Sequence, residues 1–238
     1  MISLERLLAR NLPCSRKEAR RLLDRNSDLP RELATEALPC WISLGRQSVE
    51  LHDSFHLLLN KPVGCVTALV DKAHDTAAAC IQGAPLFPEL RPVGRLDLDT
   101  TGLLLWTTDG TWLHTLTHPR SAVQRTYHAA LARPFAPLPT ELVLRDGHRP
   151  SILDLRPLQA SEAHPSLLRP DSATNFATIT IAGGAYHEIR RIFAALGSHV
   201  VSLCRVSFGD FDLPRDLAFG QWRPMAKSVV SADDRRQP

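Results

Sequence analysis

Two aspartates lie two positions apart, at Asp97 and Asp99, in the stretch "RPVGRLDLDTTGLLLWTTDG" of residues 91–110. A glycine precedes the pair and an apolar run follows it, a pattern typical of a loop that leads into a buried strand. A carboxylate in such a loop can bind a metal ion, act as a nucleophile or base, or cap the local backbone. The pair therefore marks a candidate reaction site whose chemistry the rest of the chain must decide.

A phosphoryl-transfer interpretation comes from the letters DLDTT at residues 97–101, which match the Asp-x-Asp-x-Thr sequence of aspartyl phosphatases of the haloacid dehalogenase type. That nucleophile must follow a hydrophobic parallel strand, whereas residues 91–95 read Arg-Pro-Val-Gly-Arg. The only lysine downstream is Lys227, near the end of the chain. A magnesium-dependent phosphatase therefore matches this sequence poorly.

Metal sites have little support elsewhere. His114 and His118 are spaced as helical zinc ligands, but the glutamate of a His-Glu-x-x-His motif is missing and Pro119 follows at once. The five cysteines are widely spaced and form no Cys-x-x-Cys pair, which argues against a zinc site or disulfide framework and suits a reducing cytoplasm. No apolar run is long enough to cross a membrane. We expect no metal, no cofactor and no membrane partner.

A second group of chemically active residues lies in "YHEIRRIFAALG" at residues 186–197. His187, Arg190 and Arg191 follow helical spacing, and they share one face opposite an apolar stripe. Two glycines precede this predicted helix, and a helix N-terminus after a glycine loop can seat a phosphate group. The spacing alone leaves two interpretations open, a face that contacts RNA and a solvated basic face.

Most of the elements that must hold these residues are strands. Apolar runs predict strands near residues 55–59, 103–107, 127–131, 176–181 and 200–208, with a short helix near 111–117. Helices are few, and strands and helices do not alternate regularly. We therefore predict an α+β fold with a mainly antiparallel, mixed sheet.

The N-terminal segment has a different pattern. Leucines at helical spacing predict one short helix, and Ser15 with Glu18 forms a capping box for a second. One short strand is expected near residues 41–44. The expected organisation is an N-terminal module of residues 1–53, a catalytic domain of residues 54–229 and a tail of residues 230–238.

Charge separates the module from the rest of the chain. Residues 1–31 hold eight basic and four acidic side chains, although the net charge of all 238 residues is only +3. Of the 28 basic residues 24 are arginine, the side chain best suited to forked contacts with phosphate. A basic module on a near-neutral body is expected of a protein that binds a polyanion. The charge pattern also fits a solvated helix face.

Four segments, in order and spacing, resemble the pseudouridine synthases that modify ribosomal RNA, above all the small-subunit type: LLLNKPVG, VGRLDLDTTGLLLWTTDG, VQRTYHAAL and GGAYHEIRRIFAALGSHVVSLCRVSFG. The likeness covers residues 55–225. It implies the pseudouridine synthase fold and isomerisation of one uridine to pseudouridine in ribosomal RNA, with the 16S RNA of the small subunit as the expected substrate. The partner would be this RNA, either free or in an assembling subunit.

The same resemblance assigns roles to single residues. Asp97, in the Gly-Arg-Leu-Asp motif, is expected to be catalytic, Tyr127 to stack near the target base, and Arg190 to pair with Asp97 and lower its pKa. Asp99 is expected to cap the backbone of the following threonines. Three further residues are expected to bind substrate, namely Arg95, His187 and Arg191.

The sequence departs from the family pattern in three places. Arg125 stands where lysine is usual, and Glu188 replaces the usual glutamine. The two N-terminal helices resemble an alpha-L RNA-binding motif, but residues 25–41 do not supply its Val-x-Val-Asn-Gly-like turn. We expect a monomeric, cytoplasmic RNA-isomerising enzyme. A catalytically silent RNA-binding factor is the alternative, although it would not need to keep Asp97, Tyr127 and Arg190 together.

Overall fold

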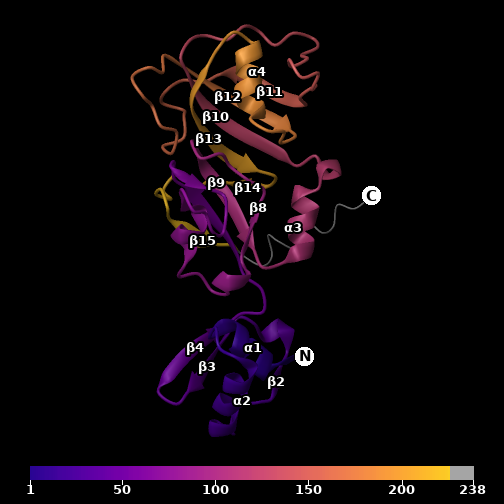
Figure 1. The fold of residues 1–238 in the computed structure, drawn as a ribbon, viewed down its shortest axis with the longest axis vertical. Helices are drawn as coiled ribbons and strands as arrows, with labels where there is room; N and C mark the ends of the chain where they lie inside the picture. The colour runs from indigo at the N-terminus through magenta and orange to yellow at the C-terminus, as the bar shows by residue number, and fades with distance from the viewer. Residues whose placement is uncertain (226–238) are drawn as a thin grey trace.

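The computed structural model describes residues 1–225, which form two parts with separate hydrophobic cores (Figure 1). The helices are α1 (Leu4–Asn11), α2 (Arg16–Arg25), α3 (Gly110–Thr117) and α4 (Glu188–Ala195), with 3-10 turns η1 (Thr35–Ala37), η2 (Ala77–Ile81), η3 (Phe87–Glu89) and η4 (Pro119–Ser121). The expected tail, residues 230–238, and the end of the expected catalytic domain lie outside the described residues.

The larger part is built on a nine-stranded sheet. Its central path runs β11 (Ile152–Pro157), β12 (Asn175–Ala182), β10 (Gln124–Leu131), β13 (Val200–Phe208), β9 (Thr100–Thr107), β5 (His56–Lys61) and β15 (Trp222–Pro224), while β14 (Phe211–Asp212) pairs with β13 and β8 (Arg91–Val93) with β9. In this sheet only β9 and β13 run parallel, at its centre. The predicted α+β fold with a mainly antiparallel, mixed sheet is therefore confirmed.

Each strand predicted from an apolar run is present, as β5, β9, β10, β12 and β13, and the helix predicted near 111–117 is α3. The apolar runs were reliable because these strands are covered on both faces. One cluster packs α4 against the face that carries Tyr127 and Ile179, and a second packs α3 against the face that carries Leu105 and Cys204. A strand buried on both sides keeps apolar residues at nearly every position.

The N-terminal part packs α1 and α2 over a hairpin of β3 (Cys40–Leu44) and β4 (Gln47–Leu51), beside a small pair of β1 (Ile2–Ser3) and β2 (Glu32–Leu33). The predicted capping box of α2 is confirmed: Ser15 and Glu18 cap each other's backbone. The prediction of one strand near 41–44 was incomplete, because β4 pairs with it. The turn lies at Gly45, whose φ of +62° favours glycine.

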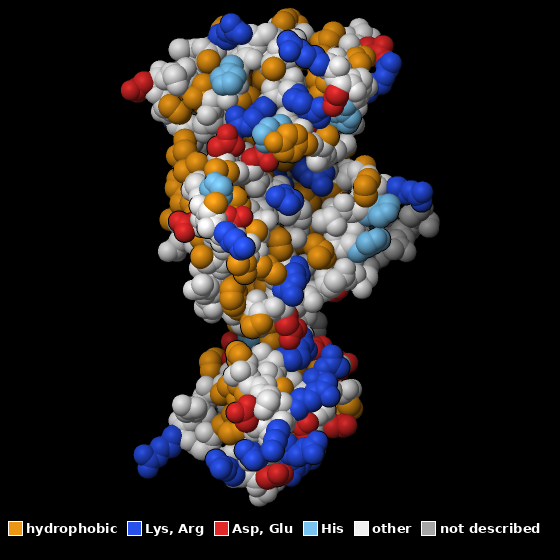
Figure 2. Space-filling model, in the orientation of Figure 1, with side chains coloured by type: hydrophobic (Ala, Val, Ile, Leu, Met, Phe, Trp, Pro, Cys, Tyr) orange, Lys and Arg blue, Asp and Glu red, His pale blue; other side chains and the backbone are white. Residues whose placement is uncertain are grey.

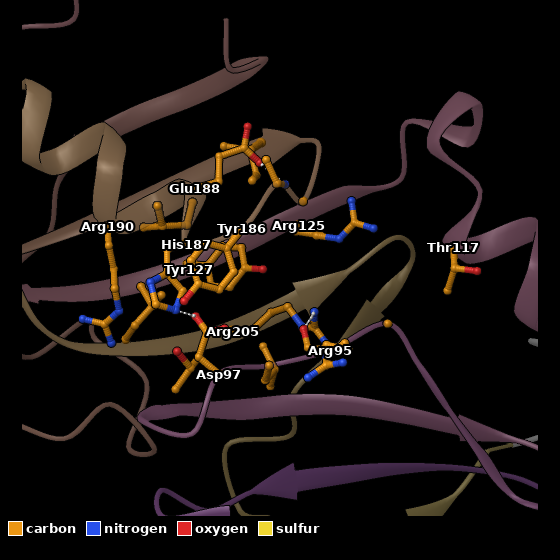
Figure 3. A pocket seen from close by; sticks show the side chains of 18 residues that line it. Arg95, Asp97, Thr117, Arg125, Tyr127, Tyr186, His187, Glu188, Arg190 and Arg205 are labelled. Carbon is orange, nitrogen blue, oxygen red and sulfur yellow. Dashed lines mark hydrogen bonds and ion pairs between the residues drawn. The ribbon is translucent and has the colours of Figure 1, made fainter. Parts of the chain in front are cut away.

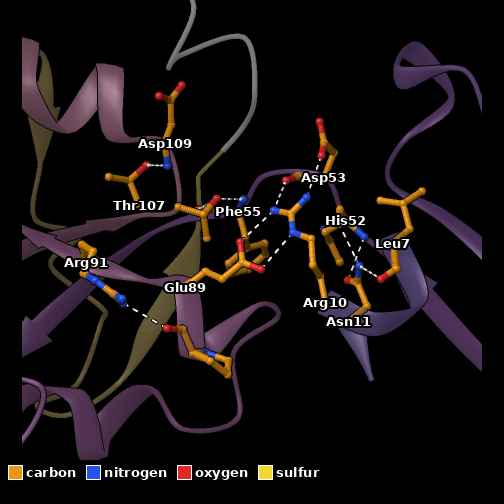
Figure 4. A network of polar contacts seen from close by, with 12 residues as sticks. Leu7, Arg10, Asn11, His52, Asp53, Phe55, Glu89, Arg91, Thr107 and Asp109 are labelled. Carbon is orange, nitrogen blue, oxygen red and sulfur yellow. Dashed lines mark hydrogen bonds and ion pairs between the residues drawn. The ribbon is translucent and has the colours of Figure 1, made fainter. Parts of the chain in front are cut away.

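A salt-bridge cluster around Arg10 joins the two parts (Figure 4). The Arg10 guanidinium, on α1, donates to both carboxylate oxygens of Glu89 on η3, each at 2.8 Å. It also donates to the carboxylate of Asp53 at 2.8 Å and to the Asp53 carbonyl at 2.7 Å. The hydrogen bonds that Arg10 donates to Glu89 are the main cause that raises the pKa of Arg10 above its usual range. The basic module is thereby held in a defined orientation to the sheet.

A short parallel pair, β6 (Cys65–Val66) and β7 (Asp75–Thr76), completes the strands of residues 1–225. Among these residues no helix is both long and apolar enough to span a bilayer.

Candidate active site

The floor of a pocket of about 350 Å³ is made by side chains that alternate along neighbouring strands (Figure 3). Arg125 and Tyr127 lie two apart on β10 and therefore point to the same side of the sheet. Arg205 on β13 is the direct neighbour of Tyr127, and Ile181 on β12 is the neighbour of Arg125. All four line the pocket. The strand register thus brings together residues from distant parts of the sequence.

Gly102 allows β9 and β13 to approach closely beside this floor. Its φ is +104°, and a Cβ atom there would lie 2.3 Å from the carbonyl oxygen of Arg205. No side chain fits that space. The glycine that follows the two aspartates is therefore a packing requirement of the parallel strand pair.

The loop that carries Asp97 is fixed by its backbone groups. The Thr67 hydroxyl donates to the Leu96 carbonyl at 2.9 Å, and the Leu96 N–H donates back to it at 3.1 Å. The Gly64 N–H donates to the Leu98 carbonyl at 2.9 Å. These contacts leave the loop little freedom, so the Asp97 side chain is presented from a rigid support.

Lys61 fixes the far end of the same loop. It is fully buried, and its Nζ donates to the carbonyl of Thr100 at 2.9 Å and to that of Pro62 at 3.0 Å. Burial lowers the pKa of Lys61. The lysine of the NKPVG segment thus acts on the backbone of the aspartate loop.

Asp97 faces His187 across the pocket. Its Oδ2 lies 3.7 Å from His187 Nε2, and the Asp97 side chain is 37% exposed. His187 is the N-cap of α4 with a left-handed φ of +49°, so the prediction that it lies within the helix was wrong by one residue. From this N-cap position the imidazole lies within ion-pair distance of Asp97. Figure 3 shows the two side chains joined by a dashed line.

Arg190 has a different partner from the expected one. Its Nη2 lies 2.8 Å from Asp99 Oδ2, and its Nη1 donates to the Val200 carbonyl at 3.1 Å. Of the two aspartates it is Asp99 that forms an ion pair with this guanidinium. The expected pairing of Arg190 with Asp97, and the expected capping role of Asp99, are therefore corrected. Both errors arise because sequence spacing does not tell which carboxylate of an alternating pair points toward a helix across the pocket.

The other predicted site residues divide into two groups. Arg95 and Tyr127 line the pocket with Asp97. Arg191 does not line it, because its Nη1 contacts the carboxylate of Asp146 in the loop before β11. On α4, Arg191 therefore faces the loop before β11, while Arg190 faces the pocket.

Glu188, the departure from the usual glutamine, is 4% exposed and fully engaged. Its Oε2 accepts from the Ala185 N–H at 2.9 Å, and its Oε1 lies 2.7 Å from His148 Nε2. The carboxylate therefore fixes the turn before α4 and is not free to react. Asp97 is the pocket's available carboxylate.

Two tyrosines border the pocket in different ways. Tyr127 is 8% exposed and belongs to the core beneath the floor. Tyr186 is 78% exposed and stacks on His187, with ring centroids 3.9 Å apart and planes 15° apart. Sequence reasoning did not select Tyr186, and its only signal is its position next to His187.

Arg205 was also missed. It is 1% exposed, with Nε donating to the Leu103 carbonyl at 2.8 Å, while its Nη2 is buried without a hydrogen-bond partner. Its sequence signal was an arginine inside the apolar strand VVSLCRVSF, where burial of a charge is costly. Among residues 1–225, no cluster of three or more His, Cys, Asp or Glu side chains is arranged to hold a metal ion.

The comparisons with known proteins agree with this architecture. The profile of the family "RNA pseudouridylate synthase" matches residues 55–195. The whole chain is similar to a solved structure described as a pseudouridylate synthase, with a TM-score of 0.60, 26% identity, and 98% and 100% of the two chains covered. The chain therefore belongs to the RNA pseudouridylate synthase family, and its fold is that of an RNA-modifying isomerase.

Two curated relatives of this chain share one name, ribosomal small subunit pseudouridine synthase A. The chain is 33% identical over 236 residues to ribosomal small subunit pseudouridine synthase A of Escherichia coli (strain K12), covering 96% of this chain and 98% of the relative. It is 35% identical over 181 residues to the protein of that name from Yersinia pestis, covering 74% and 72%.

Proposed function

We propose that this protein converts one uridine of the small-subunit ribosomal RNA to pseudouridine and that Asp97 is the catalytic carboxylate. The observation that carries the proposal is the position of Asp97. It is the only carboxylate lining the described pocket that is not committed to structural hydrogen bonds, and it stands on a rigid loop. The likeness to small-subunit synthases over nearly the full length of both chains supports the choice of RNA.

The reaction needs little beyond this arrangement. The bond between ribose C1′ and uracil N1 breaks, the base rotates, and C1′ bonds to C5. N1 gains a proton and C5 loses one, so atoms and charge balance without a redox step or an energy source. An ionised Asp97 can serve as a nucleophile at the sugar or as a base that removes a sugar proton. His187 then holds the Asp97 carboxylate in position, in the role first expected of Arg190.

The target uridine must leave its stack to enter the pocket. Tyr127 forms part of the floor against which the base lies, and Arg95 at the rim contacts the RNA. We place His187 and Arg190 with these residues as positioning groups. Arg191 is paired with Asp146, so we assign it a structural role in the loop before β11 and no contact with the substrate.

RNA binding is proposed to extend to the N-terminal module. Figure 2 shows Lys and Arg side chains gathered on the smaller part of the molecule. The exposed basic residues of α1 and α2 are Arg6, Arg16, Lys17, Arg20, Arg21 and Arg25. Their charge favours contact with phosphates on either side of the target. We further propose that the protein acts as a monomer in the cytoplasm, on free or assembling small-subunit RNA.

Mapping of pseudouridines in ribosomal RNA tests the proposal. RNA from cells with and without the gene is compared, and the deletion is complemented with wild type, Asp97→Asn or Asp171→Asn. We expect one small-subunit pseudouridine to disappear on deletion and to return with wild type and Asp171→Asn, because Asp171 is exposed and lies outside the pocket. An unchanged map after deletion would exclude ribosomal RNA as the substrate.

Tritium release from RNA labelled at uracil C5 tests the role of Asp97 directly. Asp97→Asn keeps the shape of the side chain and removes its charge, so kcat is expected to fall by at least about a thousandfold while RNA affinity is retained. If Asp97→Asn still turns over at a rate near that of wild type, another group performs the chemistry.

A further inference from the structure

The charges that line the pocket are unevenly distributed. Asp97, His187 and Arg190 lie at one end, where the acidic and basic groups pair. Arg125 and Arg205 lie on the floor away from Arg190, with Arg95 at the rim below them (Figure 3). None of these three arginines forms an ion pair with any residue in 1–225. One end of the pocket therefore has excess positive charge.

Arg205 is the least compensated of the three. It is 1% exposed, and its guanidinium has only carbonyl partners, Leu103 at 2.8 Å and Arg95 at 3.5 Å. Its Nη2 has no partner in the described structure. A buried cation without a counter-ion is unfavourable, and a bound anion would remove that cost.

Arg125 brings a second guanidinium to the same place. Its Cζ lies 4.9 Å from the centroid of the Phe208 ring, and the Cζ of Arg205 lies 5.0 Å from the same centroid. Arg125 donates to the carbonyls of Val123 and Gly183, again without an acidic partner. Burial lowers the pKa of Arg125, and the positive charge of Arg205 acts in the same direction, while Tyr127 and the hydrogen-bonded carboxylate of Glu188 act against it. Two guanidiniums near one ring repel each other, and a negative ligand between or beside them would reduce that repulsion.

We propose that Arg95, Arg125 and Arg205 form a subsite for a phosphodiester group of the RNA next to the target uridine. The inference rests on the proposed function, since it assigns this ligand to the same pocket. In this arrangement the ribose and base of the target lie at the end of the pocket that holds Asp97. The negatively charged phosphodiester lies at the end that holds the three arginines. A neutral uracil carbonyl would leave all of this positive charge in place, whereas a phosphodiester offsets one unit of it and accepts charge-assisted hydrogen bonds.

A phosphate-neutralisation experiment tests the subsite. Short RNAs that contain the mapped target are made with one phosphodiester at a time replaced by an uncharged methylphosphonate. The ribose before that position carries a 2′-O-methyl group in the modified RNA and in its control. Binding constants are measured for wild type, Arg205→Met and Arg133→Met. Arg133 is the matched control, because it follows the other end of β10, is exposed and does not line the pocket.

In wild type, neutralising the phosphate beside the target should weaken binding about tenfold, as expected for loss of charge-assisted hydrogen bonds. In Arg205→Met the same modification should cost clearly less than in wild type, because one of the three partner charges is already lost, whereas Arg133→Met should behave as wild type. The proposal is overturned if the modification costs the same in all three proteins at every position.

Folding of the variant is checked separately. If thermal melts show that Arg205→Met is unfolded, the same cycle is carried out with Arg95→Gln, whose side chain is exposed, and with Arg125→Met. Equal losses in wild type and in both of these variants also reject the subsite. Conversion of the unmodified RNA by wild type reports on the proposed function independently, so a rejected subsite with intact isomerisation leaves that function standing.

Discussion

Arg190 Nη2 lies 2.8 Å from Asp99 Oδ2, which makes the second aspartate of the loop, and not the first, the counter-ion of this arginine. Asp99 is 62% exposed and Arg190 is 20% exposed. The contact joins the aspartate loop to α4, and the hydrogen bond from Arg190 to the Val200 carbonyl extends it to β13. Asp97 is thereby left in contact with His187 and open to the pocket.

A double-mutant cycle with Arg190→Met and Asp99→Asn tests this pairing. Because the pair is largely exposed on one side, a coupling of about 0.5 to 1 kcal/mol in the free energy of unfolding is expected. Urea denaturation of the four proteins measures it. Arg190→Met alone should cost more than Asp99→Asn alone, since it also removes the bond to Val200. Additive losses in the double variant, with no coupling between Arg190 and Asp99, would show that our assignment of the partner is wrong.

The sequence predicted the strands well and the pairing of charged residues poorly. β5, β9 and β13 could be recognised because their apolar runs reflect burial on both faces. β4 was missed and β11, in the proline-rich segment where only short or edge strands are expected, was not placed, since QSVEL and ILDLRP are partly exposed and include polar residues or proline. Apolar periodicity records burial and carries little information on strands at an edge.

The sequence could indicate the position of a pocket residue when that position depends on neighbouring residues in the chain. Asp97, in its glycine-flanked loop, and Tyr127, on an apolar strand, both reach the pocket as expected. His187 reaches the pocket as the N-cap of α4 and not from within the helix. Arg191 was misplaced, because helical spacing does not tell that its side chain turns to Asp146 and away from the pocket. Arg205 depends on the register of β13 with β10, which is a long-range property that a single sequence does not reveal.

Gly102→Ala is expected to prevent stable folding. The added Cβ would lie 2.3 Å from the Arg205 carbonyl oxygen and 2.9 Å from its nitrogen, and a φ of +104° is unsuitable for alanine. Both atoms belong to the backbone, so no side-chain movement relieves the clash, and the loss should exceed about 4 kcal/mol. Gly83→Ala is the control, because its Cβ would have nothing within 4 Å. Urea denaturation that gives equal stability for both variants would show that β9 and β13 can separate at no cost.

Stability should decrease with acidification through a buried histidine. Burial, followed by the positive charge of neighbouring groups such as His164, lowers the pKa of His128 from 6.5 to about 4. Its Nδ1 accepts from the His164 N–H at 3.0 Å, so the neutral form is required. Because the folded pKa lies below the unfolded one, this stability is complete above pH 6.5 and is lost as the pH falls toward 4.

His128→Asn tests the assignment, because an amide oxygen can accept the same hydrogen bond without titrating. The free energy of unfolding of wild type should fall by about 2 kcal/mol on acidification through this window, and that of the variant should fall less. His74→Asn is the control, since the His74 side chain is 46% exposed. Urea denaturation between pH 7 and pH 5 stays above the range where most carboxylates titrate. Because burial also lowers the pKa of His56 and His164, the difference between wild type and His128→Asn gives the contribution of His128. A parallel fall in wild type and His128→Asn would assign the pH dependence to other groups.

The N-terminal module should contribute phosphate contacts without contributing to the chemistry. Deleting the module would remove Arg10 and its contacts with Glu89 and Asp53, so charge substitution is the cleaner test. Arg16, Lys17 and Arg21 are exposed on α2 and form no ion pair with residues 1–225. Replacing all three by glutamine removes charge and leaves the module core untouched.

If each of these residues contacts one phosphate, the slope of log affinity against log salt should decrease by about 2 to 3 units, while kcat at saturating RNA is unchanged. A control triple, Arg133→Gln, Arg145→Gln and Arg156→Gln, removes the same charge from the catalytic part. Equal changes in slope for the two triples would indicate a general effect of net charge. An unchanged slope in the first triple would show that the module does not contact the RNA. Recognition would then depend on the pocket, where Arg95, Arg125 and Arg205 supply the positive charge.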